Sequence, residues 1–241
     1  MTVNVDESMT GILWRRLRYM LTPQFDLYKN IAPKLKDLDV LEVGFGTGFG
    51  TVQLAQYAAW IAAIEPDGDA VAFANQVLPI KYVLWMKRDI TKVKGKPHYD
   101  AVVMVETLEH IADWRKALAN IHGLLKAGGC LYMTARNRNA DLRRNDLHER
   151  EWTGQELANA LGEFFLDVKL YDYTLTNELT ADTHITPLIA VARKAGGNES
   201  TRIDTGARWI EGRAEQTHAT NVRQAVARVD GGGGVTEQVL N

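Results

Sequence analysis

Cysteine is nearly absent from this chain, since Cys130 is the only one among 241 residues. One cysteine can form neither an internal disulfide bond nor a cysteine-rich zinc site, so we predict no metal centre and expect a reducing compartment. A basic excess is also missing, because 28 lysine and arginine residues stand against 30 aspartate and glutamate residues. The formal net charge of -2 gives no general attraction to nucleic acid or to an anionic membrane.

Apolar runs long enough to span a membrane are missing as well. The most apolar stretch, residues 51–64, is interrupted by Gln53 and Gln56 and is shorter than the ~20 residues that a span requires. The N-terminus carries Asp6 and Glu7 and lacks the basic start of a secretory signal. We therefore expect a soluble, cytoplasmic protein. A hydrophobic share of 46% and a charged share of 24% are ordinary for a globular one.

Short apolar or β-branched runs alternate with longer helical patterns between residues 37 and 194, which is typical of βαβ units. This alternation predicts an α/β fold, a three-layer α/β/α sandwich around a seven-stranded sheet. The predicted strands are 40–43, 60–64, 82–86, 101–105, 130–135, 166–173 and 188–192, and the predicted helices are 8–21, 50–58, 69–78, 114–125 and 154–164. The last helix has the clearest start signal, a capping box of Thr153 with Glu156 and a hydrophobic staple of Trp152 with Leu157.

Composition changes after Lys194. Residues 195–241 contain 8 of the 20 glycines, including the run 231–234, and no lysine. We interpret this segment as a flexible tail, although residues 215–229 could form one amphipathic helix that binds a protein partner. The predicted organisation is an N-terminal helical segment over 1–36, a main domain over 37–194 and the glycine-rich tail over 195–241.

A glycine-rich loop follows the first predicted strand. Residues 40–50 read Val-Leu-Glu-Val-Gly-Phe-Gly-Thr-Gly-Phe-Gly, with a helix predicted next. Small residues there let the backbone approach a ligand, and helix N–H groups favour negative charge. A dinucleotide fingerprint, Gly-x-Gly-x-x-Gly counted from Gly44, would need glycine at Phe49, which weakens the nicotinamide interpretation.

The pattern Glu-x-Gly-x-Gly-x-Gly over residues 42–48 resembles the first motif of class I S-adenosylmethionine-dependent methyltransferases. Acidic residues then close the second and third predicted strands, at Glu65 and Asp89. Residues 99–111, ending Leu-Glu-His-Ile, are similar to the fourth-strand motif of the ubiquinone-biosynthesis-like small-molecule branch, and residues 124–131 are similar to its turn into strand five. The resemblance covers about residues 37–194 in the right order, and it implies a Rossmann-like, mostly parallel sheet whose last strand is antiparallel.

The resemblance implies S-adenosyl-L-methionine as the cofactor. Glu65 would accept hydrogen bonds from both ribose hydroxyls, Asp89 would lie near the adenine amino group and Ile90 against the ring. Residues 1–36 would act as a lid over cofactor and substrate. Taken singly, each motif also fits a tight turn or a solvated carboxylate. The cofactor-binding residues predicted in this way are Glu42, Gly44, Phe45, Gly46, Gly48, Glu65, Pro66, Asp89, Ile90 and Glu106.

Methyl transfer from a sulfonium requires mainly an aligned nucleophile and, for weak nucleophiles, a base. The segment after strand four lacks the Asn/Asp-Pro-Pro-aromatic motif of exocyclic-amine methyltransferases, and no Pro-Cys nucleophile is present, so Cys130 is expected to pack in its strand. Glu106 and His110 are four apart and would share one face of a helical turn at the cofactor crevice. His110 is a candidate general base, with shaping of the cofactor pocket as the alternative.

An arginine-rich stretch follows strand five, where this fold usually receives substrate. Acidic residues are interspersed, so it is either a solvated, salt-bridged loop or an anion-binding lid. His148 lies in a stretch that resembles the His-x-Arg-x-aromatic-Thr stretch of many small-molecule and saccharide methyltransferases, which makes it the second candidate base. The arginines are Arg136, Arg138, Arg143, Arg144 and Arg150. The predicted substrate-binding residues are Arg136, Asn137, His148 and Arg150, and the predicted catalytic residues are Glu106, His110 and His148.

The expected function is methyl transfer from S-adenosylmethionine to an oxygen or nitrogen of a small-molecule or saccharide acceptor. A nucleotide or nucleic-acid methyltransferase using the arginine loop is one alternative, which the near-neutral charge disfavours. A catalytically inactive cofactor-binding module with a partner-binding tail is the other, because fold alone does not fix function.

Overall fold

The computed structural model describes residues 23–140 and 147–196. The predicted helix over 8–21, the arginines Arg143 and Arg144, and residues 197–241 of the predicted tail lie outside the described residues.

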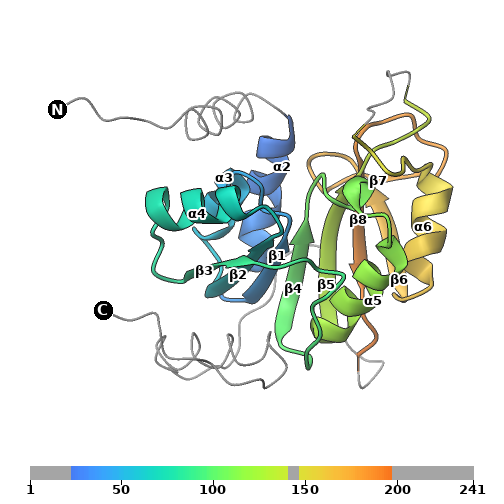
Figure 1. Ribbon diagram of the computed structural model, residues 1–241. Coiled ribbons are helices and arrows are strands. Elements are labelled where there is room, and N and C mark those ends of the chain that lie inside the picture. The colour runs from blue at the N-terminus through green and yellow to red at the C-terminus, as the bar shows by residue number, and fades with distance from the viewer. Residues whose placement is uncertain (1–22, 141–146, 197–241) are drawn as a thin grey trace.

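The described residues form one eight-stranded sheet in the order β3-β2-β1-β4-β5-β8-β6-β7, with helices between the strands (Figure 1). Strands β1 to β5 pair in parallel, whereas β8 is antiparallel to both β5 and β6. The elements are α2 Pro23–Ile31, η1 Ala32–Leu35, β1 Asp39–Val43, α3 Phe49–Leu54, β2 Trp60–Glu65, α4 Gly68–Val77, β3 Val83–Lys87, β4 Tyr99–Met104, η2 Leu108–His110, α5 Trp114–Leu124, β5 Leu125–Ala135, α6 Gly154–Gly162, β6 Asp167–Tyr171, β7 Glu178–Leu179 and β8 Leu188–Arg193.

All seven predicted strands are present, and the antiparallel last strand is confirmed. Two details differ from the prediction. Strand β5 begins at Leu125, earlier than predicted, and the predicted turn into it is an irregularity inside the strand, where the register with β4 shifts between Leu125 and Cys130 and Gly128 has a φ of 76°. The eighth strand, β7, is only two residues long, and so short a segment carries no alternating pattern that a sequence could reveal.

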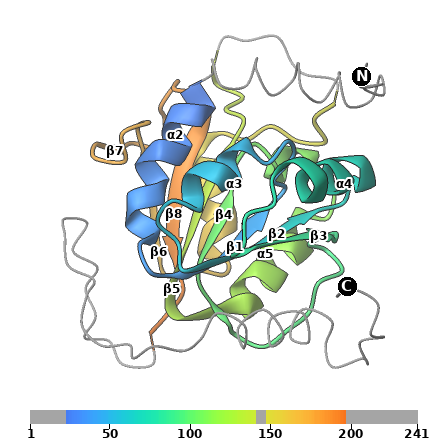
Figure 2. The ribbon, with the colours of Figure 1, turned by 90° about the vertical axis from the view of Figure 1, so that its left-hand side faces the viewer.

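Helices cover both faces of the sheet. Successive residues of a strand point to opposite faces, so Ile61 and Ala63 pack with α2, η1, α3 and α4, while Ala62 and Ile64 pack with α5 and α6. Figure 2, turned by 90°, brings α2 and α3 in front of the strands. The predicted three-layer sandwich is therefore confirmed.

The core begins ahead of residue 37, where we placed the start of the main domain. Leu27, Ile31 and Leu35, from α2 and η1, are almost completely buried in the same cluster as the sheet residues Val40 and Ile61. The described part of the predicted N-terminal lid therefore packs as an integral part of the α/β core.

The start of α6 matches its sequence signals. Thr153 Oγ1 accepts a hydrogen bond from the Glu156 backbone N–H at 3.1 Å, and Glu156 Oε2 accepts one from the Thr153 backbone N–H at 3.0 Å. Trp152 and Leu157 are both fully buried. The predicted capping box is present, and it fixes where the chain leaves the segment that carries His148.

Strand register sets the position of the site. Val43 pairs with Ile64 and Met104 pairs with Met133, so parallel strands β1, β2, β4 and β5 end close together at one sheet edge. Residues that follow these strands meet there, as in other open α/β sheets. Among the residues that the structure describes, no helix combines the length and the apolar character needed to cross a membrane.

Candidate active site

The glycine loop connects β1 to α3 and lies close to the segment after β4. Gly44 has a φ of 74°, and a Cβ there would lie 2.4 Å from Thr107 Oγ1, so only glycine permits this approach. Gly46 has a φ of 53°, but a Cβ there would meet no described residue within 4 Å. Among the described residues, the space beside Gly46 is therefore open, which is the condition for a ligand to lie against its backbone.

Glu65, at the end of β2, is bound to this loop. Its Oε2 accepts a hydrogen bond from the Gly46 backbone N–H at 3.0 Å, and its Oε1 accepts one from the Asp67 backbone N–H at 3.1 Å. Pro66 beside it is exposed. A carboxylate has about four acceptor sites, so two accepted bonds leave capacity for further donors such as ribose hydroxyls.

The residues predicted to contact adenine lie in different environments. Asp89 Oδ1 accepts hydrogen bonds from the Thr91 N–H at 2.9 Å and the Thr91 hydroxyl at 2.8 Å, and Oδ2 lies 3.3 Å from Lys92 Nζ. Burial alone would raise the pKa of Asp89, but the Thr91 hydrogen bonds and Lys92 together lower it. Ile90 is 4% exposed and packs in the α5/α6 face of the core. Asp89 is thus the more accessible of the two.

Two residues of the glycine motif, Phe45 and Glu42, are buried. Phe45 packs edge-to-face on Trp85 with ring centroids 4.9 Å apart. Glu42 has no exposed surface; its Oε1 accepts a hydrogen bond from the Tyr28 hydroxyl at 2.9 Å, which ties α2 to β1. Burial raises the pKa of Glu42 to about 7, although the Thr51 and Tyr28 hydroxyls act against it. Among its contacts in the described residues, the Glu42 carboxylate thus links the glycine motif to α2.

Glu106 follows β4 with a φ of 49°, a left-handed conformation that is uncommon for residues other than glycine. Thr134 of β5 holds it at both ends, because its Oγ1 accepts from the Glu106 N–H at 2.7 Å and donates to Glu106 Oε1 at 3.0 Å. Burial raises the pKa of Glu106, while Thr134 and the charges of Arg136 and the two histidines act in the opposite direction. A strained backbone conformation that neighbouring side chains hold in place, as Thr134 does here, is typical of functional sites.

The two predicted histidines meet at the same edge. The His110 and His148 rings lie 4.9 Å apart in an edge-to-face arrangement, and His110 Nδ1 lies 3.0 Å from the Leu147 carbonyl oxygen. The Glu109 carbonyl oxygen accepts hydrogen bonds from the backbone N–H groups of Glu149 at 2.8 Å and Arg150 at 3.3 Å. The segment after β5 is therefore bound to η2, the segment after β4.

Glu109 and Glu151 are acidic residues of this site that we did not predict. Both side-chain oxygens of Glu109 are buried and make no hydrogen bond to another described residue. Burial, together with the negative charge of Glu106, raises the pKa of Glu109 to about 8. Glu151 Oε1 lies 3.1 Å from His148 Nδ1. Its position three residues after His148 was the one signal in the sequence that could have identified it.

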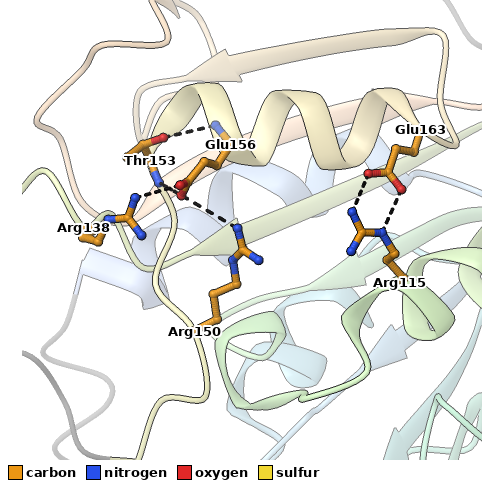
Figure 3. Close-up of polar contacts among 6 residues, drawn as sticks. All are labelled: Arg115, Arg138, Arg150, Thr153, Glu156 and Glu163. Carbon is orange, nitrogen blue, oxygen red and sulfur yellow. Dashed lines mark hydrogen bonds and ion pairs between the residues drawn. The ribbon is translucent and has the colours of Figure 1, made fainter.

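The described arginines that follow β5 are Arg136, Arg138 and Arg150, and they differ in what they act on. Arg138 lies 2.7 Å from Glu156 Oε1, and Arg150 lies 4.0 Å from Glu156 Oε2 (Figure 3). The guanidinium of Arg150 also covers the Trp152 ring at 4.1 Å. These two support the start of α6, which agrees with the salt-bridged alternative for this loop. Arg136 differs, because its charge lowers the pKa values of Glu106 and Glu109 and so acts on the site itself.

Asn137, predicted to bind substrate, is 1% exposed and has its amide occupied within the fold. Its Nδ2 donates to the carbonyl oxygens of Thr183 and Ile185, both at 2.8 Å, and its Oδ1 accepts from the Asn139 N–H at 2.9 Å. The structure thus gives Asn137 a role in holding the loop before β8. In the described residues, no group of three or more His, Cys, Asp or Glu side chains could hold a metal ion.

The chain resembles known methyltransferases in this region. Residues 41–133 match the family model described as "Methyltransferase domain". A probable S-adenosylmethionine-dependent methyltransferase of Mycobacterium tuberculosis is 28% identical over 151 residues, which are 60% of this chain and 54% of that protein. A ubiquinone biosynthesis O-methyltransferase of Coxiella burnetii is 30% identical over 110 residues, 44% of this chain and 46% of that protein. The chain thus spans about half the length of these curated relatives.

Solved structures give the same result for the fold. The N-methyltransferase NodS of Bradyrhizobium japonicum WM9, in complex with S-adenosyl-L-homocysteine, superposes with a TM-score of 0.54 at 16% identity, over 80% of this chain and 90% of that one. The Rossmann-like methyltransferase fold that the sequence predicts is therefore confirmed, with β8 antiparallel to β5 and β6.

Proposed function

We propose that this chain is a methyltransferase that moves the methyl group of S-adenosyl-L-methionine to an oxygen or nitrogen of a small-molecule or saccharide acceptor. One observation carries the proposal: the glycine loop, the Glu65 carboxylate and the Glu106–His110–His148 group converge at one edge of a methyltransferase-type sheet. One part of this edge suits a nucleoside, and the other suits proton transfer.

S-adenosyl-L-methionine is the cofactor, as the matched family model and the relatives agree. The residues present fit this group, since no described residue fills the space beside Gly46 and Glu65 lies on the loop with acceptor capacity left. The bound cofactor supplies an activated methyl on a sulfonium, so the protein need not activate a leaving group. The chain's own residues orient the acceptor and hold or move a proton.

The acceptor class is supported from two directions. The Coxiella relative is named for ubiquinone biosynthesis, which supports a small-molecule acceptor, and because it is named an O-methyltransferase and NodS an N-methyltransferase, an oxygen or a nitrogen acceptor atom is compatible with the relatives. The motif over residues 99–111 favours the ubiquinone-biosynthesis-like branch. A soluble, cytoplasmic location is part of the same proposal.

The test is a screen of hydroxyl- and amine-bearing small molecules and saccharides with S-adenosylmethionine, read out as S-adenosylhomocysteine. We expect release above the acceptor-free background for at least one class, and its loss in Glu65→Ala. Cofactor binding without S-adenosylhomocysteine release from any acceptor would favour the inactive cofactor-binding module instead.

A further inference from the structure

A histidine and a carboxylate face each other at the edge of the site, and only the histidine was predicted from the sequence. His148 Nδ1 lies 3.1 Å from Glu151 Oε1, and the two side chains are 7% and 11% exposed. At this burial water competes little for the contact, and a hydrogen bond to an ionised carboxylate is stronger than one between neutral groups. The pair therefore fixes the orientation of the His148 ring.

The contact also selects the position of the imidazole proton. An ionised carboxylate only accepts hydrogen bonds, so Nδ1 of His148 carries the proton in this contact. In the neutral ring, Nε2 is then the basic nitrogen. Serine hydrolases use a buried carboxylate in the same way, to hold a histidine in the tautomer that can accept a proton.

The surroundings place this pair beside the expected reaction centre. The His110 ring packs against His148 from η2, and the charge of His148 acts on Glu106 at the end of β4. Among the described residues, Arg136, which follows β5, and the buried Glu109 are further charged or titratable groups of this cluster. The backbone bonds from Glu149 and Arg150 to the Glu109 carbonyl oxygen hold the His148 segment in place.

We propose that Glu151 is a positioning residue for methyl transfer, which holds His148 in the Nδ1–H tautomer so that Nε2 takes the acceptor's proton. This inference rests on the proposed function. As the acceptor atom bonds to the methyl carbon, the methyl–sulfur bond breaks, and the acceptor's O–H or N–H proton passes to Nε2 and later to solvent. Glu151 balances the positive charge of the imidazolium. The acceptor class is therefore one that must lose a proton to react, a hydroxyl or a weakly nucleophilic N–H.

The first test reads the tautomer directly. Nitrogen-15 spectra of histidine-labelled full-length protein, with His148 assigned by its loss in His148→Asn, report which ring nitrogen carries the proton. We expect the Nδ1–H form in the wild type and its loss in Glu151→Gln. Glu149→Gln is the matched control, since it removes the same charge from an exposed side chain two residues away. An unchanged tautomer in Glu151→Gln overturns the inference, and this readout requires neither acceptor nor turnover.

The second test separates positioning from a structural role. Provided that its melting temperature matches that of the wild type, Glu151→Gln should lower kcat about 10- to 1000-fold and leave KM nearly unchanged. This loss is at most comparable to the loss of a general base, about 10²- to 10⁴-fold, because the base itself is still present. Glu151→Asp should recover part of kcat, and Glu149→Gln should behave as the wild type. If His148→Asn reduces kcat but Glu151→Gln does not, the inference is wrong while the proposed function stands. If the wild type releases no S-adenosylhomocysteine with any acceptor, the proposed function fails and the inference falls with it.

Discussion

Replacement of Glu65 by alanine tests the cofactor site at the residue where its geometry is best defined. The Glu65 carboxylate accepts hydrogen bonds from Gly46 at 3.0 Å and Asp67 at 3.1 Å, and it retains acceptor sites for two ribose hydroxyls. A hydrogen bond to a charged group contributes about 1.5–3 kcal/mol. Since 1.4 kcal/mol is a tenfold change, Glu65→Ala should weaken binding of S-adenosylhomocysteine about 10- to 150-fold.

The fold should tolerate this change. Both backbone N–H donors lie in exposed surroundings, where water replaces the carboxylate, so the free energy of unfolding should change by about 0.5 kcal/mol or less. Isothermal titration calorimetry with S-adenosylhomocysteine measures the affinity, and thermal melting checks the fold. Glu163→Ala is the control, because it removes a carboxylate that is not part of the proposed cofactor site. Glu163 pairs with Arg115 at the end of α6 (Figure 3). An unchanged affinity in Glu65→Ala, or tight binding of NAD to the wild type, would refute this assignment.

Three further predictions concern the loop, the arginines and the buried carboxyl. In denaturant melts, Gly44→Ala should destabilise the fold more than Gly46→Ala. Both variants strain a left-handed backbone by about 1–2 kcal/mol, but only Gly44→Ala places a Cβ 2.4 Å from Thr107. Equal destabilisation by the two variants would contradict the close approach of Gly44 to Thr107. Arg136→Ala should lower turnover, because Arg136 acts on Glu106 and Glu109, whereas Arg150→Ala should mainly lower the melting temperature, because Arg150 supports the start of α6. The reverse pattern would indicate that Arg150 binds the substrate. The Glu109 pKa is raised from its ordinary 4.5 to about 8, so its contribution to stability is present below about pH 4.5 and lost as pH rises toward 8. Glu109→Gln should therefore raise the melting temperature above that of the wild type, and by more at pH 8 than at pH 5.5. If the variant and the wild type differ in melting temperature by the same amount at both pH values, Glu109 is not held protonated.

Local patterns predicted the fold well where the signal lies within a few residues. The capping box at Thr153 and the continuous apolar run of β2 depend on neighbouring residues alone, and both are present. The start of β5 was predicted too late, because Leu125 already pairs with Tyr99 of β4, a contact between distant segments that local sequence does not show. The glycines do mark an irregularity, since the register with β4 shifts between Leu125 and Cys130.

The site could be predicted only in part, for a related reason. His110 and His148 were identified by residue type, and the structure brings them together. Thr134 was missed because its contact with Glu106 joins two strands, which no sequence spacing shows. Arg150 stays a predicted substrate ligand, because a guanidinium suits anions, but its contacts with Glu156 at 4.0 Å and with the Trp152 ring come from the fold and could not be predicted from its residue type.

A crystal structure of the chain with S-adenosyl-L-homocysteine tests the central claim most directly. Our account predicts the nucleoside against the backbone of residues 44–48, with its ribose hydroxyls on the Glu65 carboxylate, at the sheet edge that carries Glu106 and His148. Binding of the molecule elsewhere, or a Glu65 carboxylate that still contacts only Gly46 and Asp67 in the complex, would contradict it.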